Sequence, residues 1–164
     1  MIYKKNNVFC AIKTGKTGIN SVSKSIKTIA LKEKTVFALF SINCSPSIMH
    51  LIHCINLLPE KFTAMDFLSV LTGEKQHELI NKKTAIGRTR KCWLLVFEKN
   101  KKKREKIEKM LGFKEDLKLL SSKKRLKEIT EKEKLEEKLL EAFGEDFYSS
   151  LNNFFIEKSV LVVK

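Results

Sequence analysis

Two short and almost continuously apolar segments place the strongest limit on the fold of this chain. Residues 35–42, TVFALFSI, are β-branched, aromatic or aliphatic at nearly every position, and residues 91–98, KCWLLVFE, have a similar character. Apolar runs of this length without alternating polar residues are typical of strands that are buried on both faces. Residues 35–42 therefore predict a strand that is covered on both faces, and with it a parallel or mixed sheet. Residues 91–98 predict a further strand.

Apolar residues also recur at helical spacing. Between Ile19 and Ile29 they follow one another at intervals of three or four residues, which predicts a helix with one apolar face. In the apolar segment that ends at Leu58, we expect Ser45 to be the N-cap and Pro46 the first helical residue, because both residue types favour those positions. Helices are thus expected on either side of the first predicted strand.

Three further segments are less regular. Residues 6–18 fit a short helix or a strand that ends in glycines, and residues 64–71 fit either a strand or a helix. Residues 75–84 fit a short helix that follows a turn at Gly73. The resulting alternation of strands and helices around one sheet indicates the α/β class.

The charge of the chain is high and unevenly distributed. Its 33 Lys and Arg against 19 Asp and Glu give a formal net charge of +14, which favours a polyanionic partner. Residues 1–99 hold 16 of the basic and 6 of the acidic residues, whereas residues 101–146 hold 15 and 12. We therefore expect residues 1–99 to form the domain that faces the polyanion, and residues 100–164 to form a charged helical extension.

The extension is rich in Lys, Glu and Leu. Gly112 and the serines at 121 and 122 are expected to divide it into two or more helices. The last residues, 147–164, regain aromatic side chains and finish in a β-like Val-Leu-Val-Val sequence. We expect this end to dock on the rest of the protein.

Several kinds of chemistry are not expected. No apolar run approaches 18 residues and no secretory segment is recognised, so we expect a cytoplasmic protein without a membrane partner and with reduced cysteines. No nucleophile stands at motif spacing from a base, and we expect no enzyme activity, cofactor or small-molecule substrate. We expect no metal site, because Cys44, His50, His53 and Cys54 lack a Cys-x-x-Cys spacing; Cys54 fits a core residue beside a surface histidine.

Residues 14–18, TGKTG, contain the Gly-Lys-Thr sequence that ends many nucleotide-binding loops. Such a loop needs another glycine five residues before Gly15, and Cys10 occupies that position. Nucleotide hydrolysis is therefore not expected. Unpaired amides at the start of the following helix, with Lys16 beside them, instead favour contact with a sugar-phosphate backbone.

Three segments occur in a characteristic order: GINSVSKSIK at 18–27, TVFALFSINCSP at 35–46 and HELINKKTA at 77–85. They resemble the kink-turn RNA-binding superfamily of ribosomal proteins, and its eukaryotic large-subunit branch, the L-seven-a proteins, most of all. The resemblance covers about residues 9–97. The residues that carry it are Gly18, Ile19, Asn20, Val22, Ile26, Pro46, Leu79, Ile80, Asn81, Lys83 and Thr84.

The resemblance implies a three-layer α/β/α sandwich around a mixed sheet of about four strands. It also implies that a bent RNA internal loop is bound by the start of the early helix and by an apolar loop before the third segment. The residues carried over for the helix start are Gly18, Asn20, Ser21 and Lys24, and those for the apolar loop are Leu71, Thr72 and Gly73. The charge pattern adds phosphate contacts from Lys16, Lys27, Lys82, Lys83, Arg88, Arg90 and Lys91.

We therefore expect a structural protein of the large ribosomal subunit that clamps bent ribosomal RNA beside neighbouring ribosomal proteins. An alternative from another class is a winged-helix DNA-binding regulator built from residues 63–100. In that alternative, residues 63–71 form the positioning helix, residues 75–84 form the recognition helix, and the strand from Lys91 forms the wing.

Overall fold

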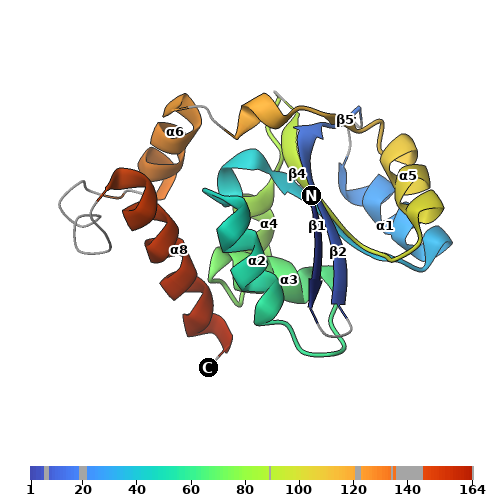
Figure 1. Cartoon of the computed structure of the whole chain (residues 1–164), viewed down its shortest axis with the longest axis horizontal. Coiled ribbons are helices and arrows are strands. Elements are labelled where there is room, and N and C mark those ends of the chain that lie inside the picture. The colour runs from blue at the N-terminus through green and yellow to red at the C-terminus, as the bar shows by residue number, and fades with distance from the viewer. Residues whose placement is uncertain are drawn as a thin grey trace. The chain divides into compact units, whose positions relative to one another are not determined.

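The computed structural model describes residues 1–5, 8–18, 22–88, 90–120, 123–133, 135 and 146–163 (Figure 1). The chain divides into two compact units, and each unit combines two separate pieces of sequence. The first unit consists of Met1–Ile42 and Ala85–Leu119, and the second of Asn43–Thr84 and Leu120–Lys164. The expected boundary between residues 99 and 100 thus falls inside the first unit.

A five-stranded sheet forms the centre of the first unit. Its strands are β1 (Ile2–Lys5), β2 (Val8–Lys16), β3 (Val36–Ser41), β4 (Lys91–Phe97) and β5 (Lys114–Glu115). The strand order is β1-β2-β4-β3, and the short β5 pairs with the far end of β2. Both apolar segments are strands as predicted, and each is buried through its middle.

All strand pairs of this sheet are antiparallel, so the expected parallel or mixed sheet is wrong. Strands β2 and β3 do run in the same direction, joined by helix α1 (Val22–Glu33). Strand β4 comes from later in the chain and pairs with both of them, so that it separates the two parallel strands. The sequence left residues 6–18 open between a helix and a strand, and it did not show this insertion.

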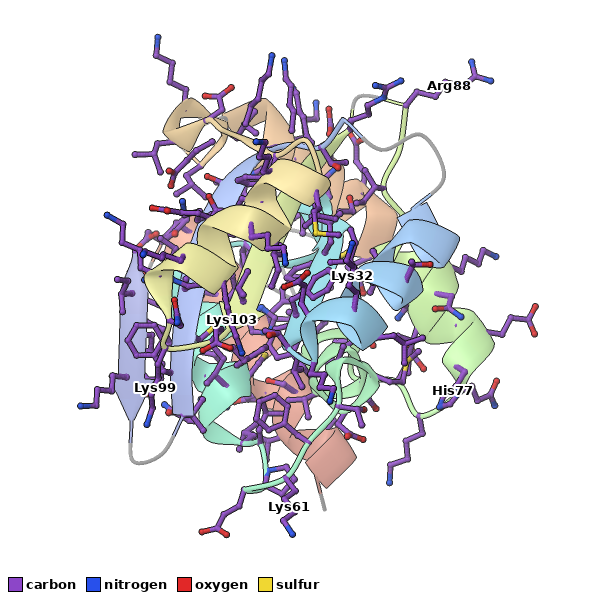
Figure 2. All side chains as sticks on the ribbon, turned by 90° about the vertical axis from the view of Figure 1, so that its right-hand side faces the viewer. Lys32, Lys61, His77, Arg88, Lys99 and Lys103 are labelled. Atoms are coloured by element: carbon purple, nitrogen blue, oxygen red, sulfur yellow. The ribbon has the colours of Figure 1, made fainter. Side chains whose placement is uncertain are left out.

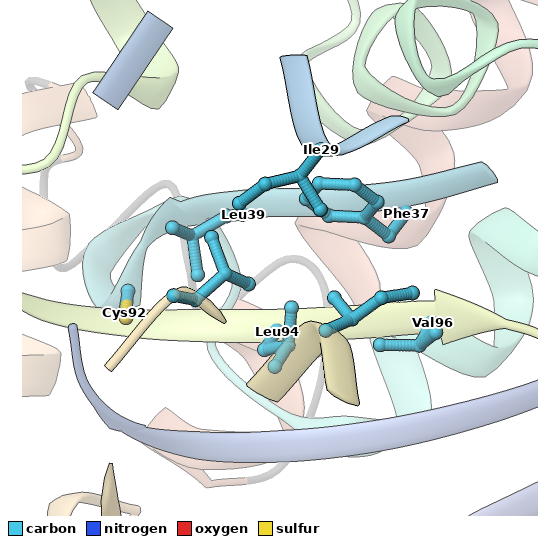
Figure 3. Packing of buried hydrophobic residues seen from close by; sticks show 8 residues of the cluster. Ile29, Phe37, Leu39, Cys92, Leu94 and Val96 are labelled. Atoms are coloured by element: carbon cyan, nitrogen blue, oxygen red, sulfur yellow. The ribbon is translucent and has the colours of Figure 1, made fainter. Parts of the chain in front are cut away.

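Two helices, α1 and α5 (Lys101–Met110), cover one face of the sheet. The side chains of this core come from both helices and from neighbouring positions of β3 and β4 (Figure 3). They are Ile29, Phe37, Leu39, Cys92, Leu94, Val96, Ile107 and Leu111. Helix α5 is charged on most of its surface, yet Ile107 and Leu111 anchor it, since both are fully buried.

The second unit is helical. Its described helices are α2 (Ile48–Asn56), α3 (Ala64–Thr72), α4 (His77–Thr84), α6 (Lys123–Glu133) and α8 (Phe147–Val163). Helix α8 packs on α2 and α3, so the C-terminal segment docks as expected. Its last residues continue the helix rather than forming a strand, because buried Leu151, Phe155 and Ser159 recur at four-residue intervals along one face.

The start of α2 also differs from the expectation. Ser47, not Ser45, is the N-cap, and its side chain accepts a hydrogen bond from the backbone N–H of His50. Ser45 is buried instead, and its hydroxyl lies 2.9 Å from Nδ1 of His50. His50 is fully buried, whereas His53, directly before Cys54, is only half-buried.

The protein is therefore a mixed α/β structure with an antiparallel five-stranded sheet and, in the described ranges, seven helices. None of the helices within those ranges has both the length and the apolar character needed to cross a bilayer.

Candidate nucleic-acid interface

Three lysines stand side by side across one end of the sheet in the first unit. Lys16 at the end of β2 pairs directly with Lys91 at the start of β4 and with Lys114 at the start of β5. We call Lys114, Lys16 and Lys91 the lysine ladder. All three are exposed, and residues that pair directly in a sheet project from the same face.

The lysine ladder lies on the sheet face opposite helices α1 and α5. Successive side chains of a strand alternate between the two faces. Because Cys92 and Leu94 pack under the two helices, Lys91 projects from the other face, together with Trp93 and Leu95. The ladder therefore closes the polar end of a face whose middle is apolar and buried.

One lysine on the helix-covered face, unlike the lysine ladder, has acidic partners. Lys13 has two acidic neighbours, Glu108 at 2.8 Å and Glu115 at 3.7 Å. Across the described residues, no acidic side chain lies within ion-pair distance of the lysine ladder. Directly opposed like charges destabilise a sheet, so the ladder gathers positive charge that no ion pair among the described residues neutralises.

Gly15 makes the third member of the ladder possible. It pairs with Glu115 in β5, and a β-carbon at Gly15 would overlap the backbone carbonyl of Lys114. The absence of a side chain thus lets β5 approach β2 closely and brings Lys114 beside Lys16.

The loop before β4 adds two arginines. Arg88 and Arg90 are both exposed, and Figure 2 shows Arg88 extending away from the ribbon. Arg90 has a φ of 56°, a left-handed conformation that is uncommon for a residue with a β-carbon. Its carbonyl accepts a hydrogen bond of 3.1 Å from the backbone N–H of Thr17, which fixes the loop next to the end of β2.

The backbone N–H of Gly18, a residue carried over for the RNA-contacting turn, is hydrogen-bonded within the protein. Its N–H donates to the carbonyls of Leu111 and Gly112, both at 3.1 Å, and the hydroxyl of Thr17 donates to the same Leu111 carbonyl at 2.8 Å. This amide of the predicted RNA-contacting turn therefore has its hydrogen-bond partners within the protein. The turn after α5 holds the chain here, and a β-carbon on Gly112 would lie 3.1 Å from the α-carbon of Gly18, closer than an ordinary contact.

Four other predicted residues of this segment lie wholly or partly outside the described part of the chain. Asn20 and Ser21 lie outside the described residues. Lys24 and Lys27 belong to helix α1, but their side chains are likewise outside the description.

The predicted apolar loop is the end of helix α3 in the second unit. Leu71 and Thr72 are 1% and 6% exposed, and the Thr72 hydroxyl donates to the carbonyl of Leu68. Gly73 caps the helix in a left-handed conformation with a φ of 68°. Leu71 and Thr72 are therefore packed side chains, and the expectation that they form an open loop is wrong.

The two predicted lysines of helix α4 differ from each other. Lys82 is exposed, whereas Lys83 is half-buried and ion-pairs with Glu74 at 2.6 Å. Burial alone would lower the pKa of Lys83, but the hydrogen bond to Glu74 and the negative charge of Glu133 raise it. Lys83 is thus a paired cation of the second unit, while Lys82 keeps the exposure that a phosphate contact needs.

The residues considered for zinc form a different arrangement. His50 lies between two buried partners, with the Ser45 hydroxyl at Nδ1 and the Cys54 thiol 3.3 Å from Nε2. Burial lowers the pKa of His50 to about 3 and raises the pKa of Cys54 to about 12. In the described part of the chain, no three metal-ligating side chains converge, and this cluster is a hydrogen-bonded element of the core.

The structure thus brings together three predicted residues, Lys16, Arg90 and Lys91, and adds Lys114, which the sequence did not reveal. Lys114 belongs to a two-residue strand inside a Lys/Glu-rich segment, so neither periodicity nor apolar character marks it. Lys82 and Lys83 belong to the other unit.

The chain matches no protein-family model and no curated protein sequence.

Proposed function

We propose that this chain is a structural RNA-binding protein of the large ribosomal subunit, located in the cytoplasm beside neighbouring ribosomal proteins. The single observation that carries the proposal is the lysine ladder, because three exposed cations in register, without an acidic partner among the described residues, favour an anionic partner. A net charge of +14 adds long-range attraction for a polyanion. The resemblance of residues 9–97 to kink-turn RNA-binding proteins favours RNA as that polyanion.

In this proposal the protein acts by binding alone. The ladder, with Arg88 and Arg90, neutralises phosphates of a bent ribosomal RNA segment, and counterion release supplies much of the affinity. Lys24, Lys27 and the residues around Asn20 extend the contact along the start of α1. A three-layer α/β/α sandwich, in which helices cover both faces of the sheet, is the architecture that accompanies this function.

Backbone strain at Arg90 supports a binding role for the loop before β4. A left-handed arginine costs about 1–2 kcal/mol relative to a relaxed backbone, and it stands beside a row of mutually repelling lysines. Strained and electrostatically unfavourable features that gather in one place are typical of binding sites.

Sucrose-gradient sedimentation tests the proposal directly. The full-length protein should co-migrate with the large subunit at high salt, and the variant Lys16→Gln/Lys91→Gln/Lys114→Gln should migrate more slowly or free. The control variant Lys32→Gln/Lys102→Gln/Lys109→Gln removes the same charge from the helix-covered side of the unit and should remain bound. Free migration of the unmodified protein would reject the ribosomal assignment.

The winged-helix alternative has one feature in its favour. Helices α3 and α4 are separated by only residues 73–76, a length that suits a helix-turn-helix unit. The segment expected to be its wing, however, is β4, which pairs with β2 and β3 inside the sheet. Duplex DNA binding that is lost in Lys82→Gln but kept in the ladder variant would favour the regulator over the RNA-binding protein.

A further inference from the structure

We infer that the lysine ladder contacts about three neighbouring phosphates of one RNA strand and does not read the bases. This inference rests on the proposed RNA-binding function and specifies the ligand of the same site. It follows from the geometry of the row, from its lack of acidic neighbours and from the residues that surround it.

The length of the row sets the number of phosphates. Neighbouring strands of a sheet lie about 4.8 Å apart, so the backbone positions of Lys114 and Lys91, with Lys16 between them, span roughly 10 Å. In a stacked nucleic-acid strand, phosphates follow one another at about 3.4 Å along the axis. A span of roughly 10 Å covers about three such steps, and so about four consecutive phosphates of one strand, and the three long lysine side chains can contact about three of them.

The register of the three lysines sets the direction of the row relative to the strands. The three lysines come from adjacent strands at one register level, so the row runs across the strands. An RNA strand that follows the ladder consequently crosses the end of β2 at a steep angle. Arg90, immediately before Lys91 and hydrogen-bonded to Thr17, extends this track on the β4 side.

The surroundings of the ladder argue against recognition of bases. Stacking on exposed aromatic rings is the main way in which proteins hold unpaired bases. Trp93 and Phe40 are both fully buried. Within the described part of the first unit, the large apolar side chains that are exposed are all aliphatic: Met1, Ile2, Leu31 and Leu117. Phe113, directly before Lys114, is half-buried and packs against the core under helices α1 and α5. The exposed residues of the described part of this unit thus give the ladder no stacking platform, and lysine contacts to phosphate carry no sequence information.

The test measures how RNA affinity depends on salt and on sequence. Full-length protein is titrated into labelled 12-nucleotide oligo(U), oligo(A) and a mixed-sequence RNA over a series of KCl concentrations. The expected affinities for the three RNAs differ by less than about threefold at a given salt concentration. Single strands lose about 0.7 in the slope of log K against log salt for each phosphate contact removed, so the ladder variant Lys16→Gln/Lys91→Gln/Lys114→Gln should reduce the slope by about 2.

The control variant Lys32→Gln/Lys102→Gln/Lys109→Gln, with the same loss of charge, should leave the slope almost unchanged. An unchanged slope in the ladder variant, or a reduction of equal size in the control, overturns the inference while RNA binding itself still stands. A more than tenfold preference among the three RNAs also overturns it. If the unmodified protein binds none of the RNAs at low salt, the proposed function fails as well. Circular dichroism of each variant establishes that the comparison is between folded proteins.

Discussion

Lys16 and Lys91 face each other directly across two antiparallel strands, and no acidic side chain in the described ranges lies within ion-pair distance of either. Opposite charges at paired positions stabilise a sheet by about 0.2–1 kcal/mol, and like charges destabilise it. The position of Lys16 in the middle of the ladder makes it the residue whose charge affects both neighbouring pairs.

Replacing Lys16 with Glu should therefore stabilise the protein and abolish RNA binding at the ladder. The change converts two repulsive pairs into two attractive ones, so urea denaturation should give a free energy of unfolding higher by roughly 0.5–2 kcal/mol. Lys16→Gln, which only removes the repulsion, should lie between the two. A loss of stability in Lys16→Glu would show that the ladder charges are compensated in a way that the strand register does not reveal.

A second prediction separates strain from binding at Arg90. Arg90 and Lys34 both have left-handed backbones, with φ values of 56° and 50°, and glycine adopts this conformation without the steric cost. Arg90→Gly and Lys34→Gly should each raise the free energy of unfolding by up to about 1 kcal/mol. Only Arg90→Gly should also weaken RNA binding in a filter-binding assay, because Lys34 ends helix α1 away from the ladder. Equal RNA affinities for the two variants would remove Arg90 from the interface.

Gly112 should affect RNA binding without contacting RNA. It has a φ of 57°, and a β-carbon there would lie 3.1 Å from the α-carbon of Gly18. Gly112→Ala should cost about 1–2 kcal/mol of stability and shift Gly18 together with the adjacent end of β2, so that RNA affinity falls. Gly87→Ala is the matched control, because nothing lies within 4 Å of its added carbon. Unchanged RNA affinity in a folded Gly112→Ala protein would contradict this coupling.

The buried His50 predicts a pH dependence of stability. Burial, then the positive charge of His53 and Lys158, lowers the pKa of His50 from 6.5 to about 3. Below pH 6.5 the unfolded chain binds a proton at His50 that the folded protein does not accept until about pH 3. This residue therefore contributes full stability above pH 6.5, and the contribution falls as the pH drops from 6.5 towards 3, by on the order of 1 kcal/mol per unit.

The measurement for His50 is a difference between two proteins. Urea denaturation at several pH values from 4 to 7 gives the slope of stability against pH for the unmodified protein and for His50→Gln. The variant should be less stable at pH 7, because Ser45 and Cys54 lose their partner, but its slope should be shallower. Equal slopes of stability against pH for the two proteins would mean that His50 has the same pKa in the folded and the unfolded protein.

The sequence was informative where one local pattern decides the structure. The apolar runs of β3 and β4 and the periodic spacing of α1 each predict an element that the structure contains. The direction of the strands could not be predicted, because it depends on β4 inserting between β2 and β3 from about fifty residues further along the chain.

Tertiary context explains the other differences. The Val-Leu-Val-Val end has β-forming residues, but it continues a helix that Asp146 caps through the amides of Tyr148 and Ser149 and that Phe155 anchors in the second unit. The candidate site was partly visible, because a basic run marks Arg90 and Lys91. Lys114 was not visible, since the close approach that Gly15 permits can be recognised only after the strands have paired.

The discontinuous composition of both units has a consequence for synthesis on the ribosome. The first unit lacks helix α5 and its core residues Ile107 and Leu111 until residue 119 has been translated and has left the exit tunnel. The second unit lacks α6 and α8 until the chain is nearly complete, although its first three helices emerge much earlier. A nascent chain of about a hundred residues therefore holds two incomplete cores at once. To avoid aggregation, its apolar strands and helices depend on chaperones or on the late and nearly simultaneous completion of both cores.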